Sequence, residues 1–202
     1  MLILCRRNAI KDVKPLPHAP VIIVANHMSH YDIICLALAT YPLKISYMAK
    51  DELFNTWFLR NFFLRMGAFP VRRGESDRRA LRRANEVLNE ANWSLGIFPE
   101  GGRSREAKLI RGHVGPALIA LRNDVLIVPA GISGTDEIKK RTRSLSGLLR
   151  RPLVTVHLGQ PFKLPQAEGK LTKEHLERCT DIIMGHVAEL LPEKYRGVYG
   201  GQ

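Results

Sequence analysis

The sequence predicts an α/β protein with one mostly parallel central sheet flanked by helices, and two patterns indicate this fold class. Short runs of β-branched and aliphatic residues recur along the chain, as in strands buried on both faces of a sheet. Segments with the spacing of an amphipathic helix separate these runs, and strands that alternate with helices form parallel sheets. Because 202 residues is the length of one ordinary domain, we expect a single domain over residues 1–202.

Six apolar runs are strand candidates. The first, VIIVA, contains only β-branched residues and alanine. Pro129 directly follows the run at 125–128 and is expected to end that strand, because proline has no N–H for a ladder bond. The clearest strands are Val21 to Ala25, Ser94 to Phe98, Val125 to Val128 and Leu153 to Leu158, with weaker candidates at Ile45 to Ala49 and Ala68 to Val71.

Helical spacing appears between and after these runs. Apolar residues of 80–91 share one helix face, and the arginines nearby lie mostly off it. A short apolar helix is expected over Pro116 to Arg122. A longer C-terminal helix is expected over 172–191, with Thr172 as its N-cap and Pro192 after its end.

Composition and charge narrow the class of protein. Thirty-one Lys and Arg against 19 Asp and Glu give a net charge of +12, which favours nucleic acid, an anionic membrane face or phosphorylated substrates as partners. Charge alone does not choose among these three. The three cysteines form no C-x-x-C pair, so we expect a reducing compartment, no disulfide framework and no metal site. No run approaches the roughly 18–20 apolar residues that span a bilayer, and residues 1–5 are too short a run for a signal peptide.

A histidine and an aspartate follow the first predicted strand, where ligands bind in parallel α/β sheets. His27 falls on the strand-to-helix turn, and Asp32 lies five residues later in the first helical turn. A carboxylate at that place can hold one imidazole nitrogen and leave the other to act as a general base on a substrate hydroxyl. Ser29 and Asp32 also have the spacing of a helix capping box, with Ser29 as the N-cap. The two interpretations are compatible, and both stay open at this point.

Three further segments are expected, like the segment at 26–32, to follow predicted strands. FPEGGRS at 98–104 has two glycines that let backbone N–H groups approach a ligand, and Arg103 matches a phosphate; the alternative is a Gly-Gly turn with an exposed ion pair. GAFPVRRG at 67–74 includes two arginines, and VPAGI occupies 128–132. With the segment at 26–32 they are expected to converge on one edge of the sheet.

These four segments resemble the four ordered blocks of the glycerolipid and lysophospholipid acyltransferase family, over about residues 19–165. NHMSHYD has the His and Asp spacing of the first block, and FPEGGRS departs from the third by a glycine in place of threonine. Arg72 stands where the second block frequently has Asp. The resemblance implies catalytic roles for His27 and Asp32 and substrate-binding roles for Arg73, Glu100, Gly101, Gly102 and Arg103.

The resemblance also implies an activity. A fatty acyl group would pass from acyl-CoA or acyl carrier protein to the sn-2 hydroxyl of 1-acyl-sn-glycerol 3-phosphate (lysophosphatidic acid), giving phosphatidic acid in phospholipid biosynthesis, with no cofactor and no metal. One alternative is the same chemistry on another lysolipid or on glycerol 3-phosphate. A second is a non-catalytic protein of this fold that binds anionic lipid or nucleic acid. No nucleic-acid module is visible, so nucleic acid is not an expected partner.

A lipid substrate requires contact with a bilayer. Aromatic and aliphatic residues of 53–66, interleaved with Arg60 and Arg65, form an amphipathic stretch that can lie in the interface. The alternative is that these aromatics pack onto the sheet. A second basic cluster spans Lys139 to Arg151. We expect a peripheral protein at the anionic, cytoplasmic face of a membrane.

Overall fold

A mixed sheet forms the centre of the protein in a computed structural model that describes residues 6–11, 16–17, 20–65, 67–71, 78–90, 92–141 and 152–201. Among these residues the sheet has seven strands in the order β1-β7-β6-β2-β5-β3-β4. Neighbouring strands are parallel except β6 and β7, which are antiparallel. The predicted mostly parallel sheet is confirmed. The strands are β1 (Arg6–Lys11), β2 (Val21–Ala25), β3 (Lys44–Lys50), β4 (Phe69–Val71), β5 (Trp93–Ile97), β6 (Leu126–Ser133) and β7 (Leu153–Leu158).

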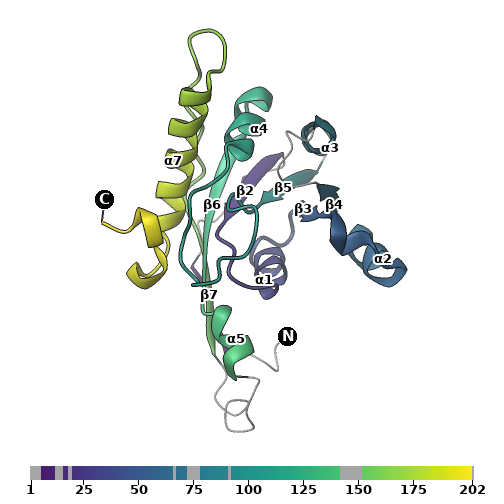
Figure 1. Cartoon of the computed structure of the whole chain (residues 1–202), viewed down its shortest axis with the longest axis vertical. Helices are drawn as coiled ribbons and strands as arrows, with labels where there is room; N and C mark the ends of the chain where they lie inside the picture. Colours follow the sequence, from purple (N-terminus) through teal and green to yellow (C-terminus); the bar gives the residue numbers. More distant parts are fainter. Residues whose placement is uncertain are drawn as a thin grey trace.

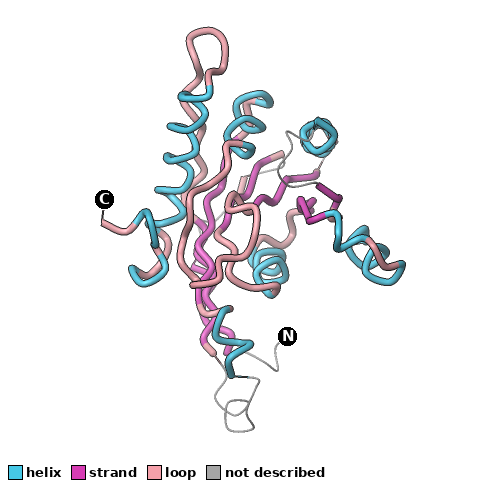
Figure 2. Tube along the Cα trace, viewed as in Figure 1, coloured by secondary structure: helices cyan, strands magenta, loops and turns pink. Residues whose placement is uncertain are grey.

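Helices cover both faces of this sheet (Figures 1 and 2). Ile22 and Val24 of β2 share one buried cluster with residues of α3, α4 and α7. Val21 and Ile23 share a second cluster with residues of α1. The VIIVA run is therefore buried on both faces, as its composition predicts. The helices are α1 (Tyr31–Ala39), α2 (Trp57–Arg65), α3 (Arg78–Asn89), α4 (Gly115–Asn123), α5 (Asp136–Arg141) and α7 (Lys173–Glu189), with 3₁₀ turns at Asp51–Phe54, Glu193–Tyr195 and Gly197–Tyr199.

The C-terminal helix α7 has the predicted N-cap, Thr172, and ends at Glu189, two residues before the predicted bound. The Thr172 hydroxyl accepts a hydrogen bond from the His175 N–H at 3.2 Å, and Pro192 follows the last turn. Its buried residues, among them Ile183 and Met184, pack against the same face of the sheet as α4. In the described part of the chain, no helix is long and apolar enough to cross a membrane.

Strand β6 is longer than predicted, because Pro129 does not end it. The strand continues to Ser133, and Pro129 is the register partner of Val24 in β2. Its carbonyl accepts the Gly159 N–H at 2.8 Å, just beyond the end of β7. The N–H and C=O of a strand residue point to the same side, so the missing N–H faces the place where the β7 ladder has ended. Proline therefore removes no hydrogen bond between β6 and β2.

Candidate active site

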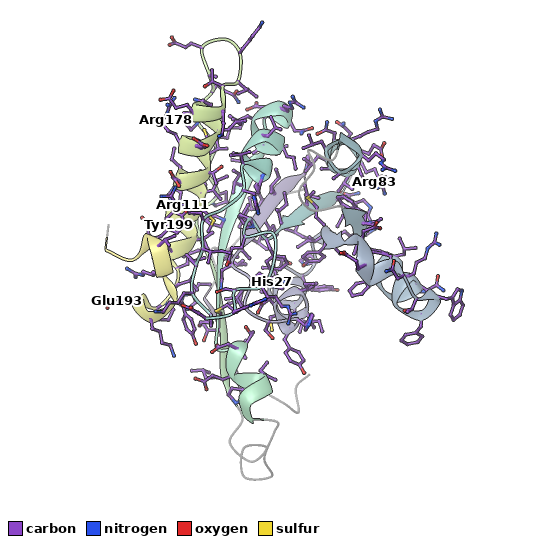
Figure 3. The ribbon with its side chains drawn as sticks, in the orientation of Figure 1. His27, Arg83, Arg111, Arg178, Glu193 and Tyr199 are labelled. Carbon is purple, nitrogen blue, oxygen red and sulfur yellow. The ribbon has the colours of Figure 1, made fainter. Side chains whose placement is uncertain are left out.

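His27 and Asp32 are in direct contact at the end of β2. His27 Nδ1 lies 2.9 Å from Asp32 Oδ2, with the histidine side chain 14% exposed and the carboxylate fully buried. Figure 3 shows His27 where α1 meets the central strands. With Nδ1 bound to the carboxylate, Nε2 is the ring nitrogen that can take a proton from a substrate. The predicted spacing thus brings the two side chains into the contact that a general base and its orienting carboxylate would need, and their catalytic roles stay a prediction.

Asp32 also closes the start of α1. Its Oδ2 accepts hydrogen bonds from the N–H groups of Met28 and Ser29, each at 2.6 Å. The N-cap residue, however, is His30, so the prediction of Ser29 as N-cap is wrong. Because the chain enters the helix one residue later, the Ser29 hydroxyl accepts the Tyr31 N–H, at 3.4 Å, and the Ser29 N–H binds back to the Asp32 carboxylate. One carboxylate therefore performs both roles that the sequence left open.

Glu100 is bound to the main chain of His27. It is 4% exposed, and its Oε1 accepts the His27 N–H at 2.8 Å. Burial raises the pKa of Glu100 to about 7, against the opposing effect of that N–H donor, and the nearby charge of Asp32 adds to the rise. Its other oxygen, Oε2, has no hydrogen-bond partner among the residues that the structure describes. A role for Glu100 in substrate binding stays a prediction, and Oε2 is the atom left for it.

The segment at 98–104 therefore holds His27 from both sides. Beyond the contact of Glu100, the Ser104 N–H donates to the His27 carbonyl at 2.8 Å. The Phe98 ring stacks on the imidazole with centroids 4.3 Å apart. The stacking was not predicted; the available signal was a phenylalanine as the last residue of the predicted strand Ser94 to Phe98.

Gly101, Gly102 and Arg103 form the middle of the segment at 98–104. Gly101 has φ +64°, and a Cβ there would lie 2.8 Å from the His113 ring, so the turn needs glycine. Gly102 is partly buried, and the Arg103 side chain is exposed one residue before the Ser104 contact to His27. Their roles in substrate binding stay predictions. Arg73, the other predicted phosphate ligand, lies outside the described residues, as does Arg72.

The expectation that all four segments follow strands is wrong for VPAGI. Residues 128–132 lie inside β6, beside the segment at 26–32 rather than at the end of a strand. Asn26 makes the contact: its Nδ2 donates to the Ile132 carbonyl at 2.9 Å, and its Oδ1 accepts the Ile132 N–H at 2.7 Å. The segments at 26–32, 98–104 and 128–132 thus meet, and 67–71 lies at the far edge of the sheet with β4.

No group of three or more His, Cys, Asp or Glu side chains that could hold a metal ion occurs within the described ranges. Cys35 and Cys179 are both buried.

Comparisons with known proteins show the family of this chain. The chain is 32% identical over 162 residues to 1-acyl-sn-glycerol-3-phosphate acyltransferase of Streptococcus pneumoniae, covering 80% of this chain and 57% of that protein. It is 29% identical over 170 residues to the Bacillus subtilis protein of the same name, covering 84% of this chain and 80% of that protein. The crystal structure of the 1-acyl-sn-glycerophosphate (LPA) acyltransferase of Thermotoga maritima has the same fold, with a TM-score of 0.58 and 24% identity over 85% of this chain and 66% of that one. The sequence model of the Acyltransferase family matches residues 7–133, more than half of the chain, and this protein therefore belongs to the Acyltransferase family.

Proposed function

We propose that this protein transfers a fatty acyl group from a thioester, acyl-CoA or acyl carrier protein, to the sn-2 hydroxyl of 1-acyl-sn-glycerol 3-phosphate. The product would be phosphatidic acid. The observation that carries the proposal is the 2.9 Å contact of His27 Nδ1 with a buried carboxylate at the end of a central strand. The names of the Streptococcus pneumoniae and Bacillus subtilis relatives support the choice of acceptor.

The residues at this edge suit a direct transfer. His27 Nε2 removes the proton of the acceptor hydroxyl as its oxygen attacks the thioester carbonyl carbon. Asp32 stabilises the imidazolium that forms, and general base catalysis of this kind is worth about 10²–10⁴ in rate. The tetrahedral intermediate then breaks its C–S bond, and the departing thiolate takes the proton from His27. Ester and free thiol leave, and the pair returns to its starting state.

Arginine is the proposed ligand of the acceptor phosphate. Arg103 is exposed and directly precedes Ser104, whose N–H binds the His27 carbonyl, and this proximity to His27 supports the proposal. A guanidinium matches phosphate with two parallel hydrogen bonds. Arg73 is proposed as the second ligand on the family resemblance alone. Another lysolipid or glycerol 3-phosphate would use the same phosphate contact and remains the alternative acceptor.

Helix α2 is proposed as the contact with an anionic membrane surface. Trp57 and Phe58 are 79% and 72% exposed, and Arg60 and Arg65 are exposed on the same helix. Phe54 and Phe63 instead pack against the core, so the aromatics of 53–66 divide between the two predicted roles. Helix α2 lies at the periphery in Figure 1. Exposed aromatics with interleaved arginines suit an interface of acyl chains and charged headgroups. Met66 and residues 142–151 of the second basic cluster lie outside the described residues.

One assay tests the reaction. Purified protein is mixed with labelled acyl-CoA or acyl carrier protein and, in separate arms, with lysophosphatidic acid, lysophosphatidylcholine or glycerol 3-phosphate. Phosphatidic acid formed from lysophosphatidic acid, and absent with the His27→Ala variant, is the expected result. If product forms only with lysophosphatidylcholine or only with glycerol 3-phosphate, that molecule is the acceptor instead. Binding to anionic vesicles with no product in any arm favours the non-catalytic alternative.

A further inference from the structure

Both oxygens of the Asp32 carboxylate are hydrogen-bonded, and they have different partners. Oδ2 accepts from His27 and from two main-chain N–H groups. Oδ1 accepts from the Thr135 hydroxyl at 2.5 Å. Thr135 and Asp32 are each fully buried, so within the described residues this hydroxyl is what replaces water at Oδ1. A buried charged oxygen without a donor is costly, and its carboxylate turns toward other partners.

Main-chain contacts on both sides of Thr135 hold it beside Asp32. Asn26, directly before His27, exchanges two hydrogen bonds with the main chain of Ile132, which ties the end of β2 to the end of β6. Gly134 then turns the chain with φ +84°, and a Cβ there would lie 2.0 Å from the Leu153 carbonyl oxygen. A residue other than glycine would move the turn and the hydroxyl that follows it. The position of Thr135 is therefore set by the main chain on both sides.

From this geometry we propose that Thr135 is a positioning residue: its hydroxyl holds Oδ1 of Asp32 so that Oδ2 stays aligned with Nδ1 of His27. The proposal rests on the proposed function, in which His27 is the base. The Thr135 hydroxyl binds Oδ1 of Asp32, so it would act on His27 through the carboxylate. Loss of the hydroxyl leaves Oδ1 beside a methyl group, and the carboxylate is then held by its Oδ2 contacts without the opposing bond.

The test compares variants that keep or remove the hydroxyl. Thr135→Val removes it at nearly constant volume, Thr135→Ala removes it with no second methyl near Asp32, and Thr135→Ser keeps it. Thr180→Val is the matched control, because Thr180 is also buried but its hydroxyl donates to the Leu176 carbonyl of its own helix. Thr135→Val and Thr135→Ala are expected to lower kcat about 10- to 100-fold with KM for lysophosphatidic acid within about twofold of the original value. Thr135→Ser should restore kcat to within about threefold, and Thr180→Val should change neither constant by more than about twofold.

A second measurement needs no substrate. The ¹H–¹⁵N NMR signals of the His27 imidazole should move in Thr135→Val and stay in place in Thr135→Ser and Thr180→Val. This readout separates the positioning role of Thr135 from the proposed acyl transfer. If the protein transfers no acyl group but its His27 signal depends on the hydroxyl, the proposed function is wrong and the positioning role stands. An unchanged His27 signal in Thr135→Val overturns the positioning role, as does a kcat equal to that of Thr180→Val. Low kcat in Thr135→Ser, or failure of both hydroxyl-free variants to fold, would mean that Thr135 is structural and would likewise overturn it.

Discussion

Replacing Glu100 with Gln is expected to change how the stability of the protein depends on pH. Gln has nearly the same shape, and its Oε1 can still accept the His27 N–H that Glu100 accepts at 2.8 Å. It carries no titrating proton. The substitution therefore removes the acid–base equilibrium of a carboxyl group that is 4% exposed and leaves its main-chain contact in place.

The sign and size of the effect follow from the pKa of Glu100. Burial raises this pKa from 4.5 to about 7, so between these pH values the folded protein keeps a proton that the unfolded chain has released. Its contribution to the free energy of unfolding is fully present below the unfolded pKa of 4.5 and is lost as the pH rises through about 7. At about 1.36 kcal/mol for each pH unit, the whole difference is about 3 kcal/mol. Glu100→Gln should therefore gain stability relative to the original protein by up to about 3 kcal/mol between about pH 4.5 and pH 8.

Urea unfolding followed by circular dichroism, at about one-unit steps over this pH range, measures the difference directly. Glu106→Gln is the control for the loss of a glutamate charge, because the Glu106 side chain is exposed. A stability difference between Glu100→Gln and the original protein that is constant with pH would refute the reasoning. It would mean that water reaches the Glu100 carboxyl in solution.

Three other predictions concern catalysis and membrane contact. His27→Ala should lower acyl transfer by about 10²–10⁴ while circular dichroism stays unchanged, and near-normal turnover would contradict its role as base. Arg103→Lys should raise KM for the phosphate-bearing acceptor much more than KM for the acyl donor. The reverse pattern would contradict a role for Arg103 in binding the phosphate. Replacing Trp57 and Phe58 together by Ser should reduce the liposome binding that survives about 1 M salt, where the Debye length is only about 3 Å. Unchanged binding by a folded double variant would direct the search to Lys139–Arg151.

Local patterns predicted most of the strands. The run at 21–25 is β2 with the same bounds, and the run at 153–158 is β7. Strand β1 was not predicted, because RRNAIK has neither an apolar run nor a regular alternation. That strand exists through its register with β7, a partner far along the chain. The direction of β7 against β6 was likewise beyond reach, since a strand's composition does not report which way its neighbour runs.

In the candidate site, too, contacts between residues close in the sequence were predictable and contacts between distant segments were not. Asp32 is five positions after His27, so one strand-to-helix turn produces their contact and the spacing reveals it. Glu100 and Thr135 reach the same pair from other segments of the chain. The resemblance indicated Glu100 for substrate binding, but its bond to the His27 main chain depends on the adjacency of β2 and β5. Nothing local distinguishes the Thr135 hydroxyl from that of any other buried threonine.

Strands β1 and β7 are neighbours in the sheet, although Lys11 and Leu153 are about 140 residues apart in the chain. A ribosome adds about 5–20 residues per second, so β1 is synthesised roughly 7–28 s before the strand it pairs with. Through that interval its main-chain groups have no β7 ladder, and unpaired strand edges are places where nascent chains associate wrongly. This edge of the sheet can be completed only after residues 153–158 have been made. Among the described strands, β1 is thus the one whose main chain waits longest for its partner during translation.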